Sequence, residues 1–469
     1  MKKSELKGKR VTVFGLGLNE GGVGTVEFLE HAGVREIIVT DAKKREDLMP
    51  SIKRLSAFKN ITFVLGQHRR EDFIRTDLVV KNPGIQWSNE YVRLALSKGI
   101  PVESDSGIFF ENCGNPIIGI TGTKGKTTTA SMIAHILRET GHGVVPVGVS
   151  QVPVLGSLGK IRPKDTIVFE LSSWRLSGLA TVKRSPHIAV FTNFFPDHLN
   201  YYRDMKSYRK DKNFIYRYQK RGDILIIGDQ VELSEGETVS EVIRVSATAQ
   251  PLPKGVFFRG DVAVIVRDEK ETTLFVKSDL KNSSEQYLAD ALAAAAAALV
   301  HGVPAKKIAT ALRSFPGVPH RLEFAGESGG IFFYNDSAAT VPEAAIAAIR
   351  SFPTSPILIA GGTDKKLPFE SFADSVVSDT KRTILLKGTA TDRLLREIRK
   401  RLPDEDVSER FPVVSSMQEA VDTAVSFAES GDVILLSPGA TSFGIFRNEF
   451  DRGERFLEAV KKIGVTKRC

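Results

Sequence analysis

Cysteine is almost missing from this sequence of 469 residues, which contains only Cys113 and Cys469. Two cysteines so far apart form neither a disulfide framework nor a zinc motif. Their scarcity indicates a reduced setting, and we expect a cytoplasmic protein. The basic start, Met1-Lys2-Lys3, leads into a strand and a glycine turn, and the apolar core of a secretion signal does not follow it.

Long apolar runs are also missing. The longest one lies within residues 280–300, but it is mostly alanine and is interrupted by Asp290, so we expect no membrane-spanning segment. Hydrophobic residues make up 42% and charged residues 26% of the chain, which is typical of a soluble globular protein. The net charge is +9, yet the basic residues are spread along the chain without a nucleic-acid recognition motif. We therefore expect anionic small molecules as ligands, and no nucleic acid.

The chain is too long for a single core, and short apolar strands alternate with helical stretches along it. This alternation predicts an α/β fold in three domains, each a mainly parallel sheet with helices, over residues 1–113, 114–316 and 317–469. Strands are expected at 11–14, 36–40, 61–65, 78–80, 116–120, 166–171, 188–192, 223–228, 332–334, 357–360, 383–386 and 433–436. Helices are expected at 23–32, 130–137, 207–218 and 287–300, and a β-rich excursion at 256–276.

The most informative motif is a phosphate-binding loop. It reads Gly122-Thr123-Lys124-Gly125-Lys126-Thr127-Thr128 and lies between an expected strand and an expected helix. The glycines let backbone N–H groups turn towards a phosphate, Lys126 supplies a charge for the outer phosphates, and Thr127 supplies a hydroxyl for Mg²⁺. Gly122 lies only three residues before Gly125, unlike the usual spacing. The order of strand, glycines, Lys-Thr and helix still predicts a phosphate site rather than a structural turn.

A second glycine-rich turn follows the first strand. It contains Gly15 and Gly17, but Glu20 occupies the third position of the dinucleotide motif, so a redox dinucleotide is less favoured. Asp41 ends the second strand, where a ribose or base hydroxyl is often held. The pattern predicts a nucleotide-like site, and a plain strand–helix turn is the alternative.

Two further side chains follow buried strands behind the phosphate loop. Glu170 ends one strand and His198 follows another. A carboxylate in this place can hold Mg²⁺, whereas histidine is a less usual ligand for a hard cation. Lys212 lies in a charged helical stretch, and composition alone predicts that it belongs to a solvated helix face.

In the third segment, four residues are candidates for ligand contacts. Arg321 follows the domain link and could reach a triphosphate, and Asp336 ends a strand and could accept ribose hydroxyls. Lys365 and Ser442 lie at two more strand ends and would suit a carboxylate. A packing or surface role is as compatible with each of them.

With these residues placed, the chain resembles the Mur ligase family over nearly its full length, and within it the branch that adds D-glutamate. The motifs that carry the resemblance are 122–128, Glu170-Leu171-Ser172-Ser173-Trp174, Asn193, Asp197-His198, Lys212, Pro319-His320-Arg321, Asn335-Asp336-Ser337, Gly361-Gly362, Asp364-Lys365, Leu436-Ser437-Pro438, Ser442 and Arg452-Gly453.

The resemblance implies a Rossmann-like N-terminal domain for a UDP-sugar, a P-loop ATPase-like central domain, and a mobile Rossmann-like C-terminal domain for an amino acid. It implies ATP-dependent ligation of D-glutamate to UDP-N-acetylmuramoyl-L-alanine through an acyl phosphate, in cytoplasmic synthesis of the peptidoglycan precursor. A monomer is expected, with no membrane and no nucleic-acid partner.

The resemblance also implies roles for individual residues. Lys126 and Thr127 would hold ATP and Mg²⁺, Glu170 and His198 would bind two Mg²⁺ ions, and Lys212 would be carbamylated. A carbamylated lysine is a carboxylate and can support a cation. The remaining nucleotide contacts would be Gly122, Thr123, Lys124, Gly125, Thr128, Arg321 and Asp336. The substrate contacts would be Gly15, Gly17 and Asp41 for the uridine nucleotide, and Thr340, Lys365 and Ser442 for the amino acid.

Three places depart from the family pattern. An expected asparagine is missing around Val149 and Ser150, an expected lysine is Ala338, and an expected asparagine pair reads Tyr287 and Asp290. These changes fall at specificity contacts, and the phosphate loop is intact. Two alternatives therefore stay open: the same chemistry with another acidic amino acid such as L-glutamate, or a P-loop kinase or NTPase with a nucleotide-sensing domain.

Overall fold

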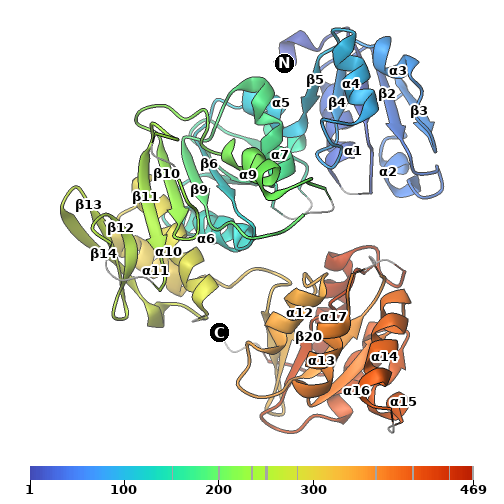
Figure 1. The fold of residues 1–469 in the computed structure, drawn as a ribbon, viewed down its shortest axis with the longest axis vertical. Coiled ribbons are helices and arrows are strands. Elements are labelled where there is room, and N and C mark those ends of the chain that lie inside the picture. The colour runs from blue at the N-terminus through green and yellow to red at the C-terminus, as the bar shows by residue number, and fades with distance from the viewer. Residues whose placement is uncertain are drawn as a thin grey trace. The chain divides into compact units, whose positions relative to one another are not determined.

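The computed structural model describes residues 1–18, 20–149, 152–198, 201–233, 236–248, 252–282, 284–364, 367–403, 406–442 and 444–466. The chain divides into two compact units, Met1–Phe315 and Pro316–Cys469 (Figure 1). The first unit contains two sheets and the second contains one, and helices flank all three. The architecture is the three-sheet α/β fold that the sequence predicts. The domain bounds 1–113, 114–316 and 317–469 remain predictions.

The N-terminal sheet is wholly parallel, with the strand order β3-β2-β1-β4-β5. Its strands are β1 (Arg10–Phe14), β2 (Glu36–Asp41), β3 (Ile61–Leu65), β4 (Leu78–Lys81) and β5 (Val102–Ser104). Its helices are η1 (Lys3–Glu5), α1 (Glu20–His31), α2 (Met49–Arg54), α3 (Glu71–Ile74), α4 (Glu90–Ser97) and α5 (Asp105–Asn112). Central β1 is almost continuously buried, because a parallel sheet is covered on both faces.

The central sheet has the order β14-β13-β12-β11-β10-β9-β6-β8-β7 and is parallel from β7 to β12. Its parallel strands are β6 (Ile117–Thr121), β7 (Val144–Val147), β8 (Thr166–Glu170), β9 (Ile188–Phe191), β10 (Ile224–Gly228), β11 (Glu241–Ser246) and β12 (Gly255–Arg259), and β13 (Val262–Arg267) and β14 (Lys270–Val276) add an antiparallel edge. Its helices are α6 (Lys126–Glu139), η2 (Leu155–Lys160), α7 (Ser173–Ser177), α8 (Leu179–Val182), α9 (Met205–Asn213), η3 (Lys277–Asp279), α10 (Glu285–Val300) and α11 (Ala305–Arg313).

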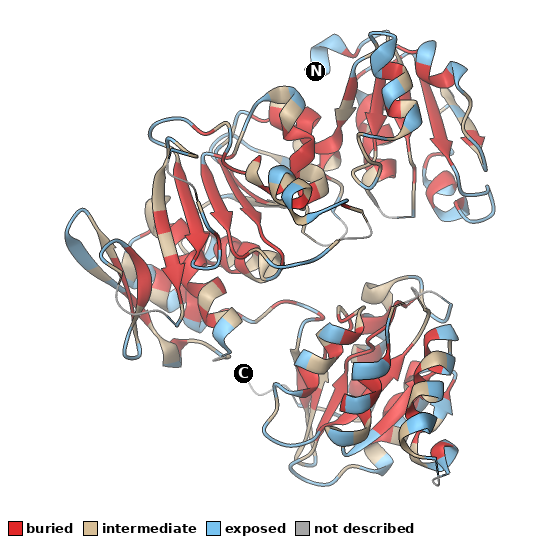
Figure 2. Ribbon diagram, viewed as in Figure 1, coloured by how far each residue is buried: buried red, intermediate tan, exposed pale blue. Residues whose placement is uncertain are grey.

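The sheet of the second unit has the order β15-β16-β20-β17-β18-β19, and only the β15–β16 pair is antiparallel. The strands are β15 (Glu323–Ser328), β16 (Ile331–Asn335), β17 (Ile357–Gly361), β18 (Arg382–Leu386), β19 (Val413–Val414) and β20 (Val433–Leu436). The helices are α12 (Pro342–Ile349), α13 (Glu370–Ser378), α14 (Thr389–Arg401), α15 (Val407–Arg410), α16 (Met417–Ser426) and α17 (Glu449–Lys462). Figure 2 shows the buried strands between helices whose outer faces are exposed.

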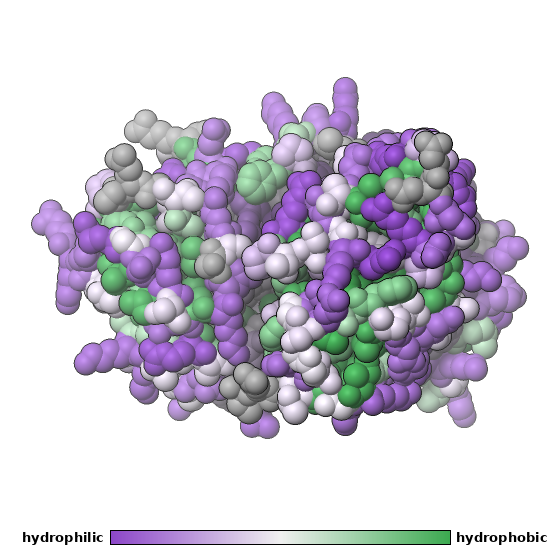
Figure 3. Space-filling model, turned by 90° about the horizontal axis from the view of Figure 1, so that it is seen from below, coloured by the Kyte–Doolittle hydropathy of each residue, from purple (hydrophilic) through white to green (hydrophobic). Residues whose placement is uncertain are grey.

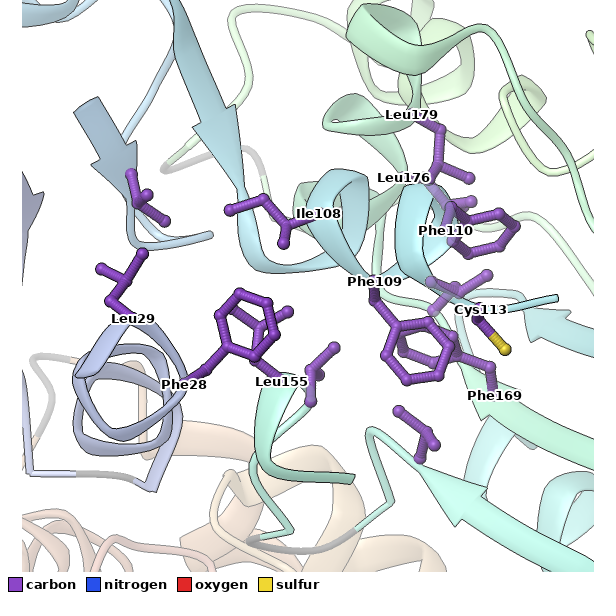
Figure 4. Close-up of a cluster of buried hydrophobic side chains, with 14 of the residues drawn as sticks. Phe28, Leu29, Ile108, Phe109, Phe110, Cys113, Leu155, Phe169, Leu176 and Leu179 are labelled. Atoms are coloured by element: carbon purple, nitrogen blue, oxygen red, sulfur yellow. The ribbon is translucent and has the colours of Figure 1, made fainter. Parts of the chain in front are cut away.

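Helix α5 joins the cores of the first two sheets. Ile108 lies on the side of α5 that faces Phe28 and Leu155, whereas Phe109 packs edge-on against Phe169 of β8 at 5.1 Å between ring centroids (Figure 4). Phe110 stacks on the same ring at 6.0 Å. This continuous apolar cluster spans the N-terminal and central sheets, which belong to one compact unit.

The strands that the sequence analysis missed lie mostly at sheet edges. They are β5, β7, β11, β15 and β19. Four of these five are edge strands, which are short or half-exposed and so carry a weak apolar signal. Helix α9 ends at Asn213, earlier than expected, and begins after Asp204, whose carboxylate accepts the backbone N–H of Ser207 at 2.7 Å.

Two further expectations from the sequence concern a membrane-spanning segment and the cysteines. Hydrophilic side chains dominate the face seen in Figure 3, with smaller hydrophobic areas between them. Within the described part of the chain, every helix is too short or too polar to cross a bilayer. Cys113 is a buried free thiol, and Cys469 lies outside the described residues.

Candidate functional site

The phosphate loop (residues 122–128) connects β6 to α6, and both of its glycines are required by space. Gly125 has φ 80° and caps α6, and a Cβ at this position would lie 2.1 Å from Asp290 Oδ1. Gly122 has φ 153°, and a Cβ there would lie 1.9 Å from Thr192 Oγ1. Any larger residue would therefore collide with the elements that brace the loop.

The residues that follow β9 hold the first half of the loop. Asn193 Oδ1 accepts the backbone N–H groups of Thr123 at 3.1 Å and of Lys124 at 2.8 Å. Thr192 Oγ1 donates to the carbonyl oxygen of Lys124 at 2.6 Å. The N–H groups in the first turn of α6 have no helical acceptor, so they are the ones suited to a phosphate. Asn193 is one of the residues that carry the family resemblance, and its place at a strand end was the available signal for a role at the loop.

Helix α10 braces the loop from behind. Asp290 is 2% exposed, and its Oδ1 accepts hydrogen bonds from Thr129 Oγ1 at 3.2 Å and Gln286 Nε2 at 2.9 Å. Gln286 Oε1 in turn accepts from Asn193 Nδ2 at 3.2 Å. The departure from the family pattern at Asp290 thus falls on a residue that packs against the loop backbone.

Two lysines meet beneath the loop. Lys126 Nζ donates to the carbonyl oxygens of Gly122 at 3.1 Å and Thr123 at 2.9 Å, and Lys212 Nζ donates to the Gly122 oxygen at 2.7 Å. Lys212 is 1% exposed, and its ammonium lies 4.8 Å from the centroid of the Tyr208 ring. Composition alone placed Lys212 on a solvated surface. That expectation is wrong, because α9 packs this side chain under the loop.

Burial controls the charge of Lys212. It lowers the pKa of this lysine well below its usual value, and repulsion from Lys126 lowers the pKa further, while Asp197 opposes the shift. The neutral amine is therefore available at a much lower pH than in a free lysine. A neutral amine is the form that can react with carbon dioxide.

Glu170 ends β8 and His198 follows β9, the two strands that flank β6. The His198 ring lies 5.2 Å from Trp174 and 5.8 Å from Tyr208, and burial lowers its pKa, with Lys126 and Lys212 adding to the effect and Asp197 opposing it. The histidine is therefore neutral near pH 7 and can offer a lone pair. Strands β6 and β8 pair Ile120 with Glu170, so the half-buried Glu170 lies beside the start of the loop.

The donor set suits a magnesium ion that is completed by phosphates. Among the described residues, no group of three or more His, Cys, Asp or Glu side chains is arranged to hold a metal. Mg²⁺ does not need one, because it usually binds one or two protein carboxylates, with waters and substrate phosphates supplying the rest. Thr127, Glu170 and His198 offer an oxygen, a carboxylate and a neutral imidazole around the loop.

The glycine turn after β1 is closed by Asp41. Its carboxylate accepts the backbone N–H of Gly17 at 2.9 Å and that of Lys43 at 2.9 Å. Gly15 has φ 93° and donates to the carbonyl oxygen of Thr40 at 2.8 Å. The structure therefore brings together the three residues predicted for the uridine nucleotide. A carboxylate has about four acceptor sites, so Asp41 can still accept a ligand hydroxyl.

Polar contacts join Trp87 and Asp105 to α7, the helix that follows Glu170. Trp87 Nε1 donates to Ser177 Oγ at 2.9 Å, and Arg175 Nε lies 3.4 Å from Asp105 Oδ2. A Cβ on Gly148 would lie 3.2 Å from Arg175 Nη1, so this cation reaches the segment that departs from the family pattern. Of that segment, Val149 is half-buried. Ser150 lies outside the described residues.

The second unit holds the other candidates. Asp336 Oδ1 accepts the N–H of Leu322 at 3.2 Å and its Oδ2 accepts Ser437 Oγ at 2.8 Å; burial raises its pKa to about 7. Each Asp336 oxygen accepts one hydrogen bond, which leaves further acceptor sites on the carboxylate, and its contact with ribose hydroxyls remains a prediction. Arg321 is exposed.

The residues predicted for the amino acid also belong to this unit. Ser442 is 2% exposed, and its hydroxyl has no hydrogen-bond partner among the described residues. Thr340 and Ala338 are half-buried at the end of β16, where the N–H of Ala338 donates to the carbonyl oxygen of His320 at 3.0 Å. Lys365 lies outside the described residues.

Three family models match the chain. Residues 9–104 match the "Mur ligase MurD-like, N-terminal domain", residues 120–298 the "Mur ligase middle domain", and residues 320–439 the "Mur ligase, glutamate ligase domain". The UDP-N-acetylmuramoylalanine–D-glutamate ligase of Roseiflexus sp. (strain RS-1) is 39% identical, over 97% of this chain and 99% of its own. The enzyme of the same name from Borreliella burgdorferi is 33% identical, over 98% and 99%.

Solved structures show the same fold at lower identity. The UDP-N-acetylmuramate-alanine ligase MurC from Thermotoga maritima aligns with a TM-score of 0.58 at 17% identity, covering 97% of this chain and 99% of its own. MurF from Thermotoga maritima, solved in complex with ADP, aligns with a TM-score of 0.51 at 14% identity, covering 98% and 96%.

Proposed function

The chain belongs to the Mur ligase family, and from this premise we propose that it joins D-glutamate to UDP-N-acetylmuramoyl-L-alanine at the expense of ATP. The reaction is ATP-dependent amide-bond formation in peptidoglycan precursor synthesis. One observation carries the proposal more than any other: Lys126 and the buried Lys212 converge on the Gly122 carbonyl within the phosphate loop of a chain that aligns end to end with D-glutamate ligases.

In the first half-reaction, the substrate carboxylate attacks the γ-phosphorus of ATP and ADP leaves, which gives an acyl phosphate. The first-turn N–H groups of α6 and the Lys126 ammonium offset the charge that accumulates on the phosphates. Gly122, Thr123, Lys124, Gly125 and Thr128 would shape the loop around ATP. Arg321 and Asp336 would also contact the nucleotide.

For the cations we propose Thr127, Glu170, His198 and carbamylated Lys212 as the residues that hold two Mg²⁺ ions. The ions would supply Lewis-acid charge compensation at the phosphates. The chemistry of the donor set supports this assignment. The depressed pKa of Lys212 and its position under Gly122 support carbamylation, because the neutral amine adds to carbon dioxide and loses a proton to give the anionic carbamate.

In the second half-reaction, the amine of glutamate attacks the acyl carbon and phosphate leaves. Thr340, Lys365 and Ser442 would hold the carboxylates of glutamate, and the orphan hydroxyl of Ser442 supports its part in this set. Gly15, Gly17 and Asp41 would line the site for the uridine nucleotide. Domain closure would keep water from the acyl phosphate.

The finer expectations from the sequence belong to the same proposal. We propose domains at 1–113, 114–316 and 317–469, a monomer, a cytoplasmic location, and no nucleic-acid or membrane partner. The alignment with ligases of one name over almost the whole chain supports an enzyme with small-molecule substrates.

The test is phosphate release in the presence of ATP, Mg²⁺ and UDP-N-acetylmuramoyl-L-alanine with a panel of amino acids. We expect stimulation by D-glutamate and a product one glutamyl residue heavier by mass spectrometry. Stimulation by L-glutamate alone would identify a different amino-acid substrate. The panel includes L-glutamate because Ala338 stands where the family pattern has a lysine. Phosphate transfer or hydrolysis without an amide product would favour a kinase or NTPase and overturn the proposal.

A further inference from the structure

Arg452 lies in the first turn of α17 and is completely buried. Its Nε donates to Ser337 Oγ at 3.0 Å, its Nη2 to the Ser337 carbonyl oxygen at 2.9 Å, and its Nη1 to the Ala440 carbonyl oxygen at 3.0 Å. One guanidinium therefore joins the loop after β16 (residues 336–340) to the loop after β20 (residues 437–442). Its planar fork fixes the spacing of the two loops.

The loop after β17 lies against Arg452 and the loop after β20. The N–H of Thr363, after β17, donates to the carbonyl oxygen of Thr441 at 2.8 Å. A Cβ on Gly362 would lie 3.5 Å from Arg452 Nη1. Arg452 thus lies where three loops meet at the carboxyl edge of the sheet, the edge at which α/β sheets bind ligands.

The positive charge of Arg452 is not neutralised by an ion pair. Among the described residues, no carboxylate lies within 4.0 Å of its guanidinium, and its partners are two carbonyl groups and a hydroxyl. Burial lowers its pKa to about 9, with Glu449 and Asp336 opposing the shift, so the side chain stays protonated at neutral pH. Burying a charge without a counter-ion is costly, and the three hydrogen bonds of Arg452 offset only part of that cost.

We propose that Arg452 is a positioning residue for an anionic amino-acid substrate. Its fork holds the two loops at the spacing that lets Thr340 and Ser442 bind a dicarboxylate, and its charge favours an anion at that edge. Because Arg452 is fully buried, it acts through the loops and does not touch the ligand. The inference rests on the proposed function, since it places glutamate at these loops.

The decisive experiment compares Arg452→Lys and Arg452→Met in the full-length protein, with Arg455→Met as the matched control. Arg455 lies one turn along α17 and is exposed, with Asp451 and Glu458 nearby. For Arg452→Met we expect the KM for D-glutamate to rise at least about tenfold, while the KM values for ATP and the UDP-sugar change less than about twofold. Arg452→Lys keeps the charge and should give a smaller rise.

A measurement that does not need glutamate tests the proposed function separately from the role of Arg452. Hydroxylamine attacks the acyl carbon of an acyl phosphate, forms a C–N bond, expels phosphate and leaves a hydroxamate. The Arg452 variants should form the UDP-sugar hydroxamate at the wild-type rate. Absence of hydroxamate from the wild-type protein would overturn the proposed function.

An unchanged KM for glutamate, or an equal rise for all three substrates, would overturn the role of Arg452 alone. If Arg452→Met does not fold by circular dichroism, Arg452→Lys and Ser337→Ala decide the question. Ser337→Ala removes one partner of the fork and should raise the same KM by a smaller factor.

Discussion

Lys212 and Lys126 donate hydrogen bonds to the same acceptor, the carbonyl oxygen of Gly122, at 2.7 Å and 3.1 Å. Two ammonium groups on one carbonyl repel each other, and burial together with this repulsion lowers the pKa of Lys212. The pair therefore divides into a cation for the phosphates, Lys126, and a neutral amine that is available for modification, Lys212.

Lys212 should be carbamylated, and its modification should depend on pH. The neutral amine is the reactive form, so the carbamate should form near neutral pH and be lost as acidification protonates the amine. We expect bicarbonate to restore activity to acid-treated, carbon-dioxide-depleted protein, and ¹³C-labelled bicarbonate to give a carbamate signal by NMR. Lys206→Ala, an exposed position on the same helix, should respond like the parent. An equal response of Lys212→Ala and the parent would contradict the assignment.

Lys126→Ala should abolish measurable turnover, a fall of at least about 1,000-fold in kcat, because the phosphates lose the cation held at the loop. Initial rates of phosphate release measure this effect. Lys160→Ala, at an exposed position in the same unit, serves as the control and should keep the parent rate. Retained activity in Lys126→Ala would remove the basis for the nucleotide assignment.

Gly125→Ala should destabilise the protein by about 1–3 kcal/mol and weaken ATP binding, since the new Cβ meets both a left-handed backbone and Asp290. Gly141→Ala is a matched control at the other end of α6. Its φ is 88°, but no atom lies within 4 Å of its Cβ position. This variant therefore reports only the cost of placing alanine in a left-handed backbone conformation. Thermal unfolding and ATP titration separate the two effects. Equal losses of both properties in the two variants would argue against a steric role for Asp290.

Asp336 should make the protein less stable as the pH rises from about 4 to about 7. Its folded pKa of about 7 lies above its unfolded value of 3.8, so the folded state holds a proton that the unfolded state releases in this range. The stabilisation is complete below about pH 4 and is reduced by up to about 4 kcal/mol above pH 7. Denaturant unfolding across this range should show a shallower pH dependence for Asp336→Asn. Parallel curves for the two proteins would refute the shift.

Several features could be predicted from the sequence because they depend on local rules. The phosphate loop was recognisable from Gly122, Gly125 and Lys126, since glycines and a Lys-Thr pair between a strand and a helix act through the backbone of one short segment. Central strands such as β1, β6 and β20 were equally clear, because a parallel strand buried on both faces is a continuous apolar run. Edge strands such as β19 were missed, since half of their surface is exposed.

The sequence by itself determined the order of the elements, the phosphate loop and the family resemblance. Only the tertiary structure decided which polar side chains lose contact with water. Lys210 and Lys212 are two residues apart, yet the first is exposed and the second lies under Gly122. Arg452 and Ser337 are 115 positions apart and share a hydrogen bond. The burial and the hydrogen-bond partners of these side chains depend on segments that meet only after folding, so a local sequence pattern does not predict them.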